Sequence, residues 1–154
     1  MTAKARGFEI ERAIEARCNP GRLADLLVTP ATWPAWQREI VSVDRDGRVR
    51  AGDVVRGRAS MLGFSVFGHS EITREPPVFD EDVIVGVHMR VTYELKGNGA
   101  PTTVVHRVNA ELPGGPLGWL LSLFLRRRLR RMQAQTLAAL VAQAEADPSS
   151  IATM

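Results

Sequence analysis

The sequence of 154 residues has a single cysteine, only two lysines and no long apolar run. The lone Cys18 excludes a framework of intramolecular disulfides. No N-terminal stretch combines a basic start, an apolar core and a small-residue cleavage site, so we expect no signal peptide. The longest apolar run, residues 117–125, is far shorter than the roughly 20 residues that span a bilayer. We therefore expect a cytoplasmic protein with one domain over residues 1–146 and a disordered tail over 147–154.

Positive charge is concentrated at one place in the chain. Outside residues 126–131, the sequence has 15 basic and 17 acidic side chains. A nucleic-acid-binding protein usually spreads basic residues over a face and interleaves aromatic ones, so this distribution disfavours nucleic acid as a partner. Two other interpretations stay open, a solvated helix face and a surface that docks on an anionic membrane. The residues concerned are Arg126, Arg127, Arg128, Arg130 and Arg131.

Short alternating segments separated by turn residues predict seven strands. The first covers Phe8–Ile14, and the others cover residues 40–44, 53–62, 64–73, 80–87, 88–96 and 102–112. Short connections favour antiparallel neighbours. After the first strand, Asn19-Pro20 predicts a helix that runs to Val28, with the asparagine as its cap. A short helical turn through residues 31–33 follows, and Pro34 is expected to limit it.

Two of these strands indicate one buried and one wet face of the sheet. In each, alternate residues are apolar while their neighbours are polar. The buried set is Met89, Val91, Tyr93 and Leu95 on one strand, and Val104, His106, Val108, Ala110 and Leu112 on the next.

A single long helix is predicted over residues 117–146, after a break at residues 113–116. At about 100° per residue, one apolar stripe occupies an arc of about 100° and all five arginines fall outside it. This stripe is expected to cover the buried face of the sheet; it consists of Leu121, Leu125, Leu129, Met132, Thr136 and Leu140. Four further apolar residues of the first turns lie off the stripe and need another partner: Trp119, Leu120, Leu123 and Phe124.

Three segments carry a family resemblance through their order and spacing. They are the first strand before Asn19-Pro20, the segment Trp33-Pro34-Ala35-Trp36 before the second strand, and the closing helix from Gly115 to Arg131. Together they resemble the START/polyketide-cyclase superfamily (SRPBCC, the helix-grip fold of the birch-pollen allergen), and the last is similar to its bacterial cyclase/dehydrase-like branch. The resemblance covers about residues 7–145.

The resemblance implies an α+β helix-grip fold. A seven-stranded antiparallel sheet would wrap around the C-terminal helix, with two short helices after the first strand and an apolar cavity between sheet and helix. The expected ligand-binding residues are Trp36, Met61, Met89, Val91, Tyr93, His106, Val108, Leu121, Leu125 and Met132. The off-stripe residues Trp119, Leu120, Leu123 and Phe124 would form the cavity mouth and contact the two short helices.

Catalytic candidates are few. His106 and Tyr93 share the buried parity and are able to orient a ligand carbonyl, while Arg12 lies on the apolar face of the first strand and is able to anchor an anion. An inert core role for each is the competing interpretation. The histidines have no metal-ligand spacing, so we expect no metal and no cofactor. No set of residues matches a named catalytic group of an aromatase or cyclase.

Three functions follow from these observations. The first is a binding module for one hydrophobic small molecule, lipid- or polyketide-like. The second is an enzyme of the same fold, a cyclase or dehydratase. The third is a peripheral membrane or partner-binding protein that uses residues 119–131. The sequence does not separate the first two, and it leaves the oligomeric state open.

Overall fold

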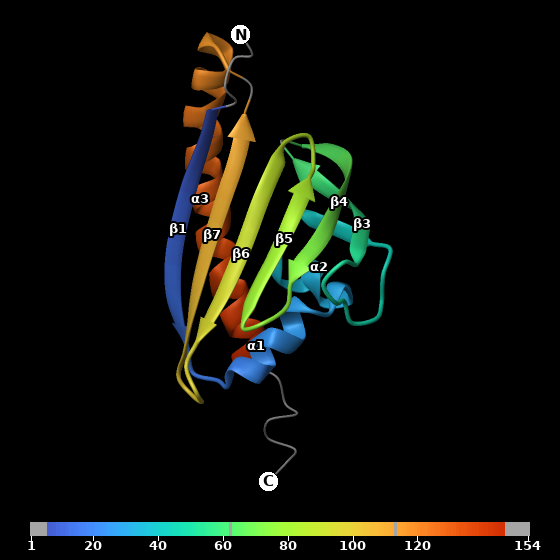
Figure 1. Cartoon of the computed structure of the whole chain (residues 1–154), viewed down its shortest axis with the longest axis vertical. Coiled ribbons are helices and arrows are strands. Elements are labelled where there is room, and N and C mark those ends of the chain that lie inside the picture. The colour runs from blue at the N-terminus through green and yellow to red at the C-terminus, as the bar shows by residue number, and fades with distance from the viewer. Residues whose placement is uncertain (1–5, 62, 113, 147–154) are drawn as a thin grey trace.

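Seven antiparallel strands form one sheet, in the order β1-β7-β6-β5-β4-β3-β2. The computed structural model describes residues 6–61, 63–112 and 114–146 (Figure 1). Its long C-terminal helix packs along the sheet, and two short helices lie between β1 and β2. The predicted helix-grip fold is confirmed. The strands are β1 (Arg6–Ala16), β2 (Ile40–Val43), β3 (Val54–Met61), β4 (Phe64–Arg74), β5 (Val78–Ile84), β6 (His88–Lys96) and β7 (Thr102–Leu112).

The helices begin where proline permits. Helix α1 (Pro20–Leu27) has Pro20 in its first turn, and its N-cap Asn19 makes no hydrogen bond through its side chain, contrary to our expectation. The 3₁₀ turn η1 (Pro30–Thr32) runs directly into α2 (Trp33–Trp36). Pro34 does not end this segment, because it occupies the first turn of α2, where its missing amide hydrogen is not needed.

The inner face of the sheet carries the core. In β6 and β7 the residues of predicted buried parity alternate inward, with Met89 half-buried at one end. The outer face is more polar, and Val105 is buried there although its parity points outward. Trp33 and Trp36 of α2 are buried in the same core, beneath the inner face. The predicted alternation therefore holds for both strands.

A pair of glycines lets neighbouring strands of the sheet approach one another closely. Gly57 of β3 and Gly68 of β4 lie directly opposite each other on the inner face. A Cβ on Gly57 would lie 2.5 Å from the carbonyl oxygen of Ser42, and one on Gly68 would lie 2.8 Å from that of Ile84. No larger residue fits without moving backbone, so these two positions need glycine for the close approach of neighbouring strands.

Helix α3 (Pro116–Glu145) runs beside β1 and β7 (Figure 1). Its second half also packs against α1 and α2, so its buried face is broader than the predicted stripe and includes Gln133, Leu137, Val141 and Ala144. The first turns extend past the start of β1 and lose the sheet as a partner (Figure 1). As a result Leu121, which we expected inside, is 39% exposed.

No described helix is both long and apolar enough to cross a membrane. Residues 147–154, for which we predicted a tail, lie outside the described part of the chain, as does Leu62 at the end of the predicted third strand.

Candidate ligand cavity

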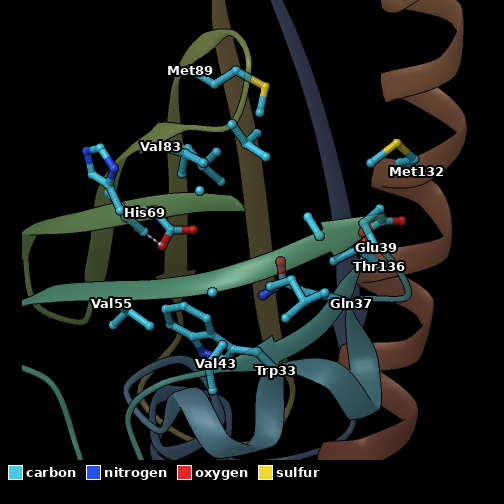
Figure 2. Close-up of a pocket in the computed structure, with 18 of the residues that line it drawn as sticks. Trp33, Gln37, Glu39, Val43, Val55, His69, Val83, Met89, Met132 and Thr136 are labelled. Atoms are coloured by element: carbon cyan, nitrogen blue, oxygen red, sulfur yellow. Dashed lines mark hydrogen bonds between the residues drawn. The ribbon is translucent and has the colours of Figure 1, made fainter. Parts of the chain in front are cut away.

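A cavity of about 180 Å³ lies between the inner face of the sheet and α3. Figure 2 shows Trp33 at its base, with Met132 and Thr136 of α3 facing Val83 and Met89 of the sheet. Most of its wall is apolar, and the polar residues that also line it come from several different strands. Apolar walls with a few placed polar groups are typical of small-molecule sites. The apolar lining is Trp33, Ile40, Val43, Val55, Ala59, Val83, Val85, Met89, Val91, Val108, Leu129 and Met132.

The cavity is open to solvent on one side. Ile40, Val83, Met89 and Met132 face inward but are only partly buried. Glu39 lies at the same rim, and its partial burial raises the pKa of its carboxyl. A ligand is therefore able to enter between the start of β2 and the middle of α3.

Tyr93 forms the centre of an aromatic cluster in the wall of the cavity. Its ring lies 4.5 Å from the ring of His106 and 6.1 Å from that of Trp36, centroid to centroid. Among the described residues its hydroxyl has no hydrogen-bond partner, and no fully buried side-chain polar atom in this part of the chain is left unpaired. The Tyr93 hydroxyl therefore faces the cavity, where it is able to donate to a ligand. Burial raises its pKa well above the usual value, so it stays protonated.

The tautomer of His106 is fixed by Gln133 of α3. The amide Nε2 of Gln133 lies 2.9 Å from Nδ1 of His106 and 3.1 Å from the His106 carbonyl oxygen. The carbonyl only accepts, so this nitrogen is the donor, and Nδ1 accepts from it. The ring proton is then on Nε2. Burial lowers the pKa of His106 to about 4, which keeps the ring uncharged at neutral pH.

Among the residues that the structure describes, Glu81 is the one buried carboxyl in the cavity wall. It is 6% exposed, and the hydroxyl of Ser70 donates a hydrogen bond of 2.6 Å to its Oε2. Burial penalises the charged form and raises the pKa of Glu81 to about 7, although the hydrogen bond from Ser70 opposes this shift. Both protonation states are therefore populated near neutrality. A carboxyl of this kind is able to give or take a proton.

The sheet brings these three groups to one wall. Tyr93 on β6 lies opposite His106 on β7 and opposite Phe79 on β5. Glu81 is two residues beyond Phe79 on the same face, so it is a diagonal neighbour of Tyr93. The wall therefore combines a phenol, an imidazole N–H and a carboxyl within an apolar surface.

The structure places the expected ligand residues in different environments. Six of them line the cavity: Met89, Val91, Tyr93, His106, Val108 and Met132. Trp36 is buried beside Tyr93, and Leu125 is a buried residue of α3. Neither is part of the cavity wall. Leu121 is exposed, and the side chain of Met61 lies outside the described part of the chain.

The structure places two further groups of expected site residues outside the cavity wall. Arg12 is opposite His106 in the register of β1 and β7, but it is exposed on an edge strand and does not line the cavity. The expected mouth residues are also outside the wall and exposed: Trp119, Leu120, Leu123 and Phe124. They lie far from α1, which packs near the other end of α3, where Arg22 donates to the carbonyl of Ala144.

Sequence reasoning missed Glu81, Ser70 and Gln133. A signal for Glu81 was present, because it has the same parity as Phe79 and Val83 within a run of three acidic residues. Gln133 belongs to the part of α3 that is buried from two sides, which the helical stripe did not reveal.

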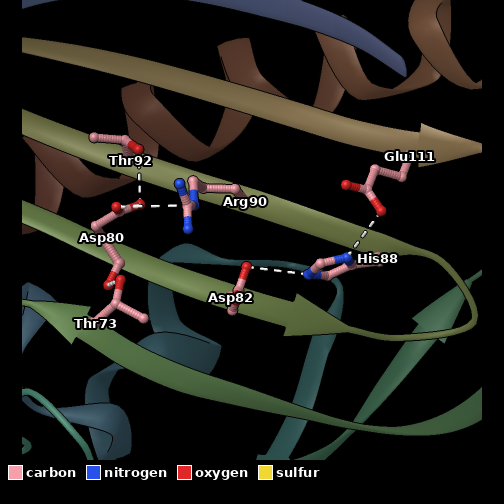
Figure 3. Close-up of polar contacts among 7 residues, drawn as sticks. All are labelled: Thr73, Asp80, Asp82, His88, Arg90, Thr92 and Glu111. Carbon is pink, nitrogen blue, oxygen red and sulfur yellow. Dashed lines mark hydrogen bonds and ion pairs between the residues drawn. The ribbon is translucent and has the colours of Figure 1, made fainter. Parts of the chain in front are cut away.

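A separate polar cluster lies on the outer face of the sheet, on β4 to β7 (Figure 3). His88 bridges two carboxylates: its Nε2 lies 3.1 Å from Asp82 and its Nδ1 lies 3.1 Å from Glu111. Both contacts raise the pKa of His88, that of Glu111 first, because the ring donates from both nitrogens only when it is protonated. Arg90 and Thr92 contact Asp80 beside it. Within the described ranges, no three His, Cys, Asp or Glu side chains are arranged to hold a metal ion.

Comparison with known proteins is decisive at the level of family. Residues 7–145 match the family described as "Polyketide cyclase / dehydrase and lipid transport". The chain belongs to this family. It is therefore a member of the START/SRPBCC helix-grip superfamily. No curated protein sequence matches it.

Solved structures with the same fold are distant in sequence. The Zhui aromatase/cyclase from Streptomyces sp. R1128 is 15% identical, with a TM-score of 0.77 over 91% of this chain and 94% of that one. The protein TTHA0849 from Thermus thermophilus is 18% identical, with a TM-score of 0.72 over 89% and 97%. A START superfamily protein from Mycobacterium smegmatis is 13% identical, with a TM-score of 0.70 over 88% and 97%. At these identities the likeness concerns the fold alone.

Proposed function

We propose that this member of the polyketide cyclase/dehydrase and lipid transport family binds a hydrophobic small molecule, lipid- or polyketide-like, in the cavity between the sheet and α3. The observation that carries the proposal is an open, mostly apolar cavity whose wall presents Tyr93, His106 and Glu81. A ligand carbonyl or hydroxyl group would accept from the Tyr93 hydroxyl and from Nε2–H of His106, while its apolar part covers the remaining wall.

The size of the cavity limits what it encloses. Its volume of about 180 Å³ is smaller than the roughly 300–1,000 Å³ of pockets that enclose drug-sized ligands. We therefore propose that the oxygen-bearing end of the ligand enters the cavity, while a longer apolar part lies in the opening beside Ile40 and Met132.

Filling the cavity should weaken binding without unfolding the protein. Ala59 lines the cavity from β3, so the ring in Ala59→Phe would occupy the space of the ligand. We expect the affinity for N-phenyl-1-naphthylamine, an uncharged apolar fluorescent probe, to fall at least about tenfold, because the probe loses the apolar surface that it would bury. The measurement is a fluorescence titration, supported by native mass spectrometry of the purified full chain for co-purified ligands.

The matched control is Ser60→Phe, at the next residue of the same strand, which is exposed on the outer face. This variant should bind the probe as the unmodified protein does. Equal probe affinity in both variants would contradict binding in the cavity. A second control, Phe124→Ser, removes an exposed apolar side chain of α3 and should leave the cavity signal unchanged.

We propose, as a second function, a cyclase-type enzyme of the same fold, because Glu81 combines a pKa of about 7 with a place in the cavity wall. Its carboxylate would remove a proton from a carbon flanked by carbonyls, and Tyr93 and His106 would donate to the enolate oxygen. The enolate carbon would then attack a second carbonyl of the same substrate. The new alkoxide would recover the proton from Glu81, so no oxidant or metal takes part.

A general base in an apolar cavity should open the ring of 5-nitrobenzisoxazole, which releases a coloured nitrophenolate when its C–H proton is removed and its N–O bond breaks. We expect the rate to rise as pH passes about 7, where Glu81 ionises. Glu81→Gln should lower the rate at pH 8 by roughly 100-fold. Glu71→Gln, an exposed position on β4, is the control. Equal rates for the two variants would contradict the role of Glu81 as the general base.

A further inference from the structure

The first turns of α3 form an exposed apolar tip. Its six large side chains are between 39% and 80% exposed, whereas only Gly118 and Leu125 of this part of the helix are buried. The tip lies at one end of the long axis of the molecule (Figure 1). Neither the cavity nor the core uses it, and contiguous exposed apolar surface of this kind marks an interaction site. The apolar tip consists of Leu117, Trp119, Leu120, Leu121, Leu123 and Phe124.

The next turns of α3 carry a collar of five exposed arginines. None of them forms an ion pair with a residue that the structure describes; Arg126 only stacks on the ring of Phe8, 5.6 Å from its centroid. At about 100° per residue the arginines fall in the same outward arc of about 200° as the residues of the apolar tip other than Leu121, which belongs to the inward stripe. The arginine collar consists of Arg126, Arg127, Arg128, Arg130 and Arg131.

Apolar and basic residues are thus separated along the helix rather than around it. The centres of the two groups are about eight residues apart, or about 12 Å along an α-helix. Side chains that enter a bilayer interface go about 5–10 Å into the boundary between headgroups and acyl chains. With the tip at that depth, the collar lies at the level of the lipid phosphates, which guanidinium groups bind in bidentate fashion.

Charge distinguishes an anionic bilayer from other occupants. Two copies joined through their tips would bring ten arginines together, and the charges would repel one another. Nucleic acid offers phosphates but no apolar layer for the tip. Outside the collar, 17 acidic residues outnumber 15 basic ones, so the rest of the chain carries a small net negative charge. An anionic membrane therefore attracts the end of the molecule with the collar and does not attract the remainder.

We propose that the apolar tip and the arginine collar of α3 dock the protein on the surface of an anionic lipid bilayer. The tip enters the headgroup region, the collar binds lipid phosphates, and the sheet stays in water. This inference is independent of the cavity: docking requires no bound ligand, and binding in the cavity requires no membrane.

Flotation of the full chain with lipid vesicles tests the proposal. We expect binding to vesicles of phosphatidylcholine with about 30% phosphatidylglycerol and none to phosphatidylcholine alone. Replacing the five arginines by glutamine should weaken binding by roughly fivefold per arginine, replacing them by lysine should retain most of it, and added salt should lower it. Trp119→Ser with Phe124→Ser should abolish binding. The control Phe67→Ser removes a still more exposed aromatic residue from the outer face of β4 and should change nothing.

Trp119 reports the depth of docking. It is the exposed tryptophan, whereas Trp33 and Trp36 are buried in the core. Its emission should shift to the blue with anionic vesicles and be quenched by lipids brominated near the headgroup. Three results would overturn the proposal: no flotation, flotation that the arginine-to-glutamine variant retains in full, or a stable dimer in solution that Trp119→Ser with Phe124→Ser dissociates.

Discussion

Replacing Glu81 by glutamine should make the protein lose stability on mild acidification, and replacing His106 by asparagine should make it gain stability over the same range. In the unmodified protein the two effects on the free energy of unfolding should cancel over this range. The reason is that both side chains are buried in the cavity wall and that burial shifts their pKa values in opposite directions.

Glu81 binds a proton more readily when the protein is folded. Its pKa is 4.5 when exposed and about 7 in the cavity wall. Between these values the folded state holds a proton that the unfolded state has released, so the free energy of unfolding falls as pH rises, by about 1.4 kcal/mol per pH unit. The stabilisation is fully present below pH 4.5 and is lost by about pH 7.

His106 acts in the opposite sense. Its pKa falls from 6.5 to about 4 on burial, so between these values the unfolded state binds the extra proton. The free energy of unfolding then falls by about 1.4 kcal/mol for each pH unit of acidification. Between about pH 4.5 and 6.5 the two slopes cancel, and removing either residue exposes the other slope, for a change on the order of 3 kcal/mol across the window.

Urea denaturation at several values between about pH 4.5 and 8 measures these slopes, and each variant is compared with the unmodified protein at the same pH. The exposed residues Glu71 and His69 provide matched controls as Glu71→Gln and His69→Asn. The double variant at Glu81 and His106 should lose both slopes, since the groups contribute additively. Parallel pH profiles for Glu81→Gln and Glu71→Gln would show that Glu81 does not titrate from a buried site.

Local sequence pattern predicted β6 and β7 well because each has one buried face and one more exposed face. In β6 and β7 the alternation that includes Tyr93 and His106 placed both side chains inward, as observed. Turn residues and Pro20 marked the ends of elements to within a few residues. That α3 packs along the sheet as its closing element was predicted from the family resemblance. No single segment specifies it.

The remaining errors have a common physical origin, since periodicity shows which residues share a face but not whether another element covers that face. Leu121 continues the stripe of α3 but lies where the helix has passed the sheet. Arg12 has inward parity on an edge strand that leaves it in solvent. Gln133 is buried only because α3 is covered from two sides, and its hydrogen bond to His106 joins residues 27 positions apart.

Trp36 illustrates the difference between the core and the cavity wall. We expected it to contact ligand, yet it is 1% exposed behind Tyr93 and forms no part of the cavity lining. Its indole packs edge-on against the Tyr93 ring and donates a hydrogen bond of 3.2 Å to the hydroxyl of Thr32. Trp33, three residues earlier in α2, lines the cavity and donates to the carbonyl of Leu27 instead.

Trp36→Ala should therefore be the most destabilising single change considered, at about 3–5 kcal/mol, because a fully packed indole is replaced by a void. The decrease in Tm would be on the order of 10 °C, measured by calorimetry. The milder pair Trp36→Phe and Trp33→Phe separates the roles of the two tryptophans. Trp36→Phe should lower stability and leave the affinity for N-phenyl-1-naphthylamine unchanged, whereas Trp33→Phe should alter that affinity because its ring forms the cavity base. If Trp36→Phe lowered the affinity as much as Trp33→Phe, the position of Trp36 behind the cavity wall would be contradicted.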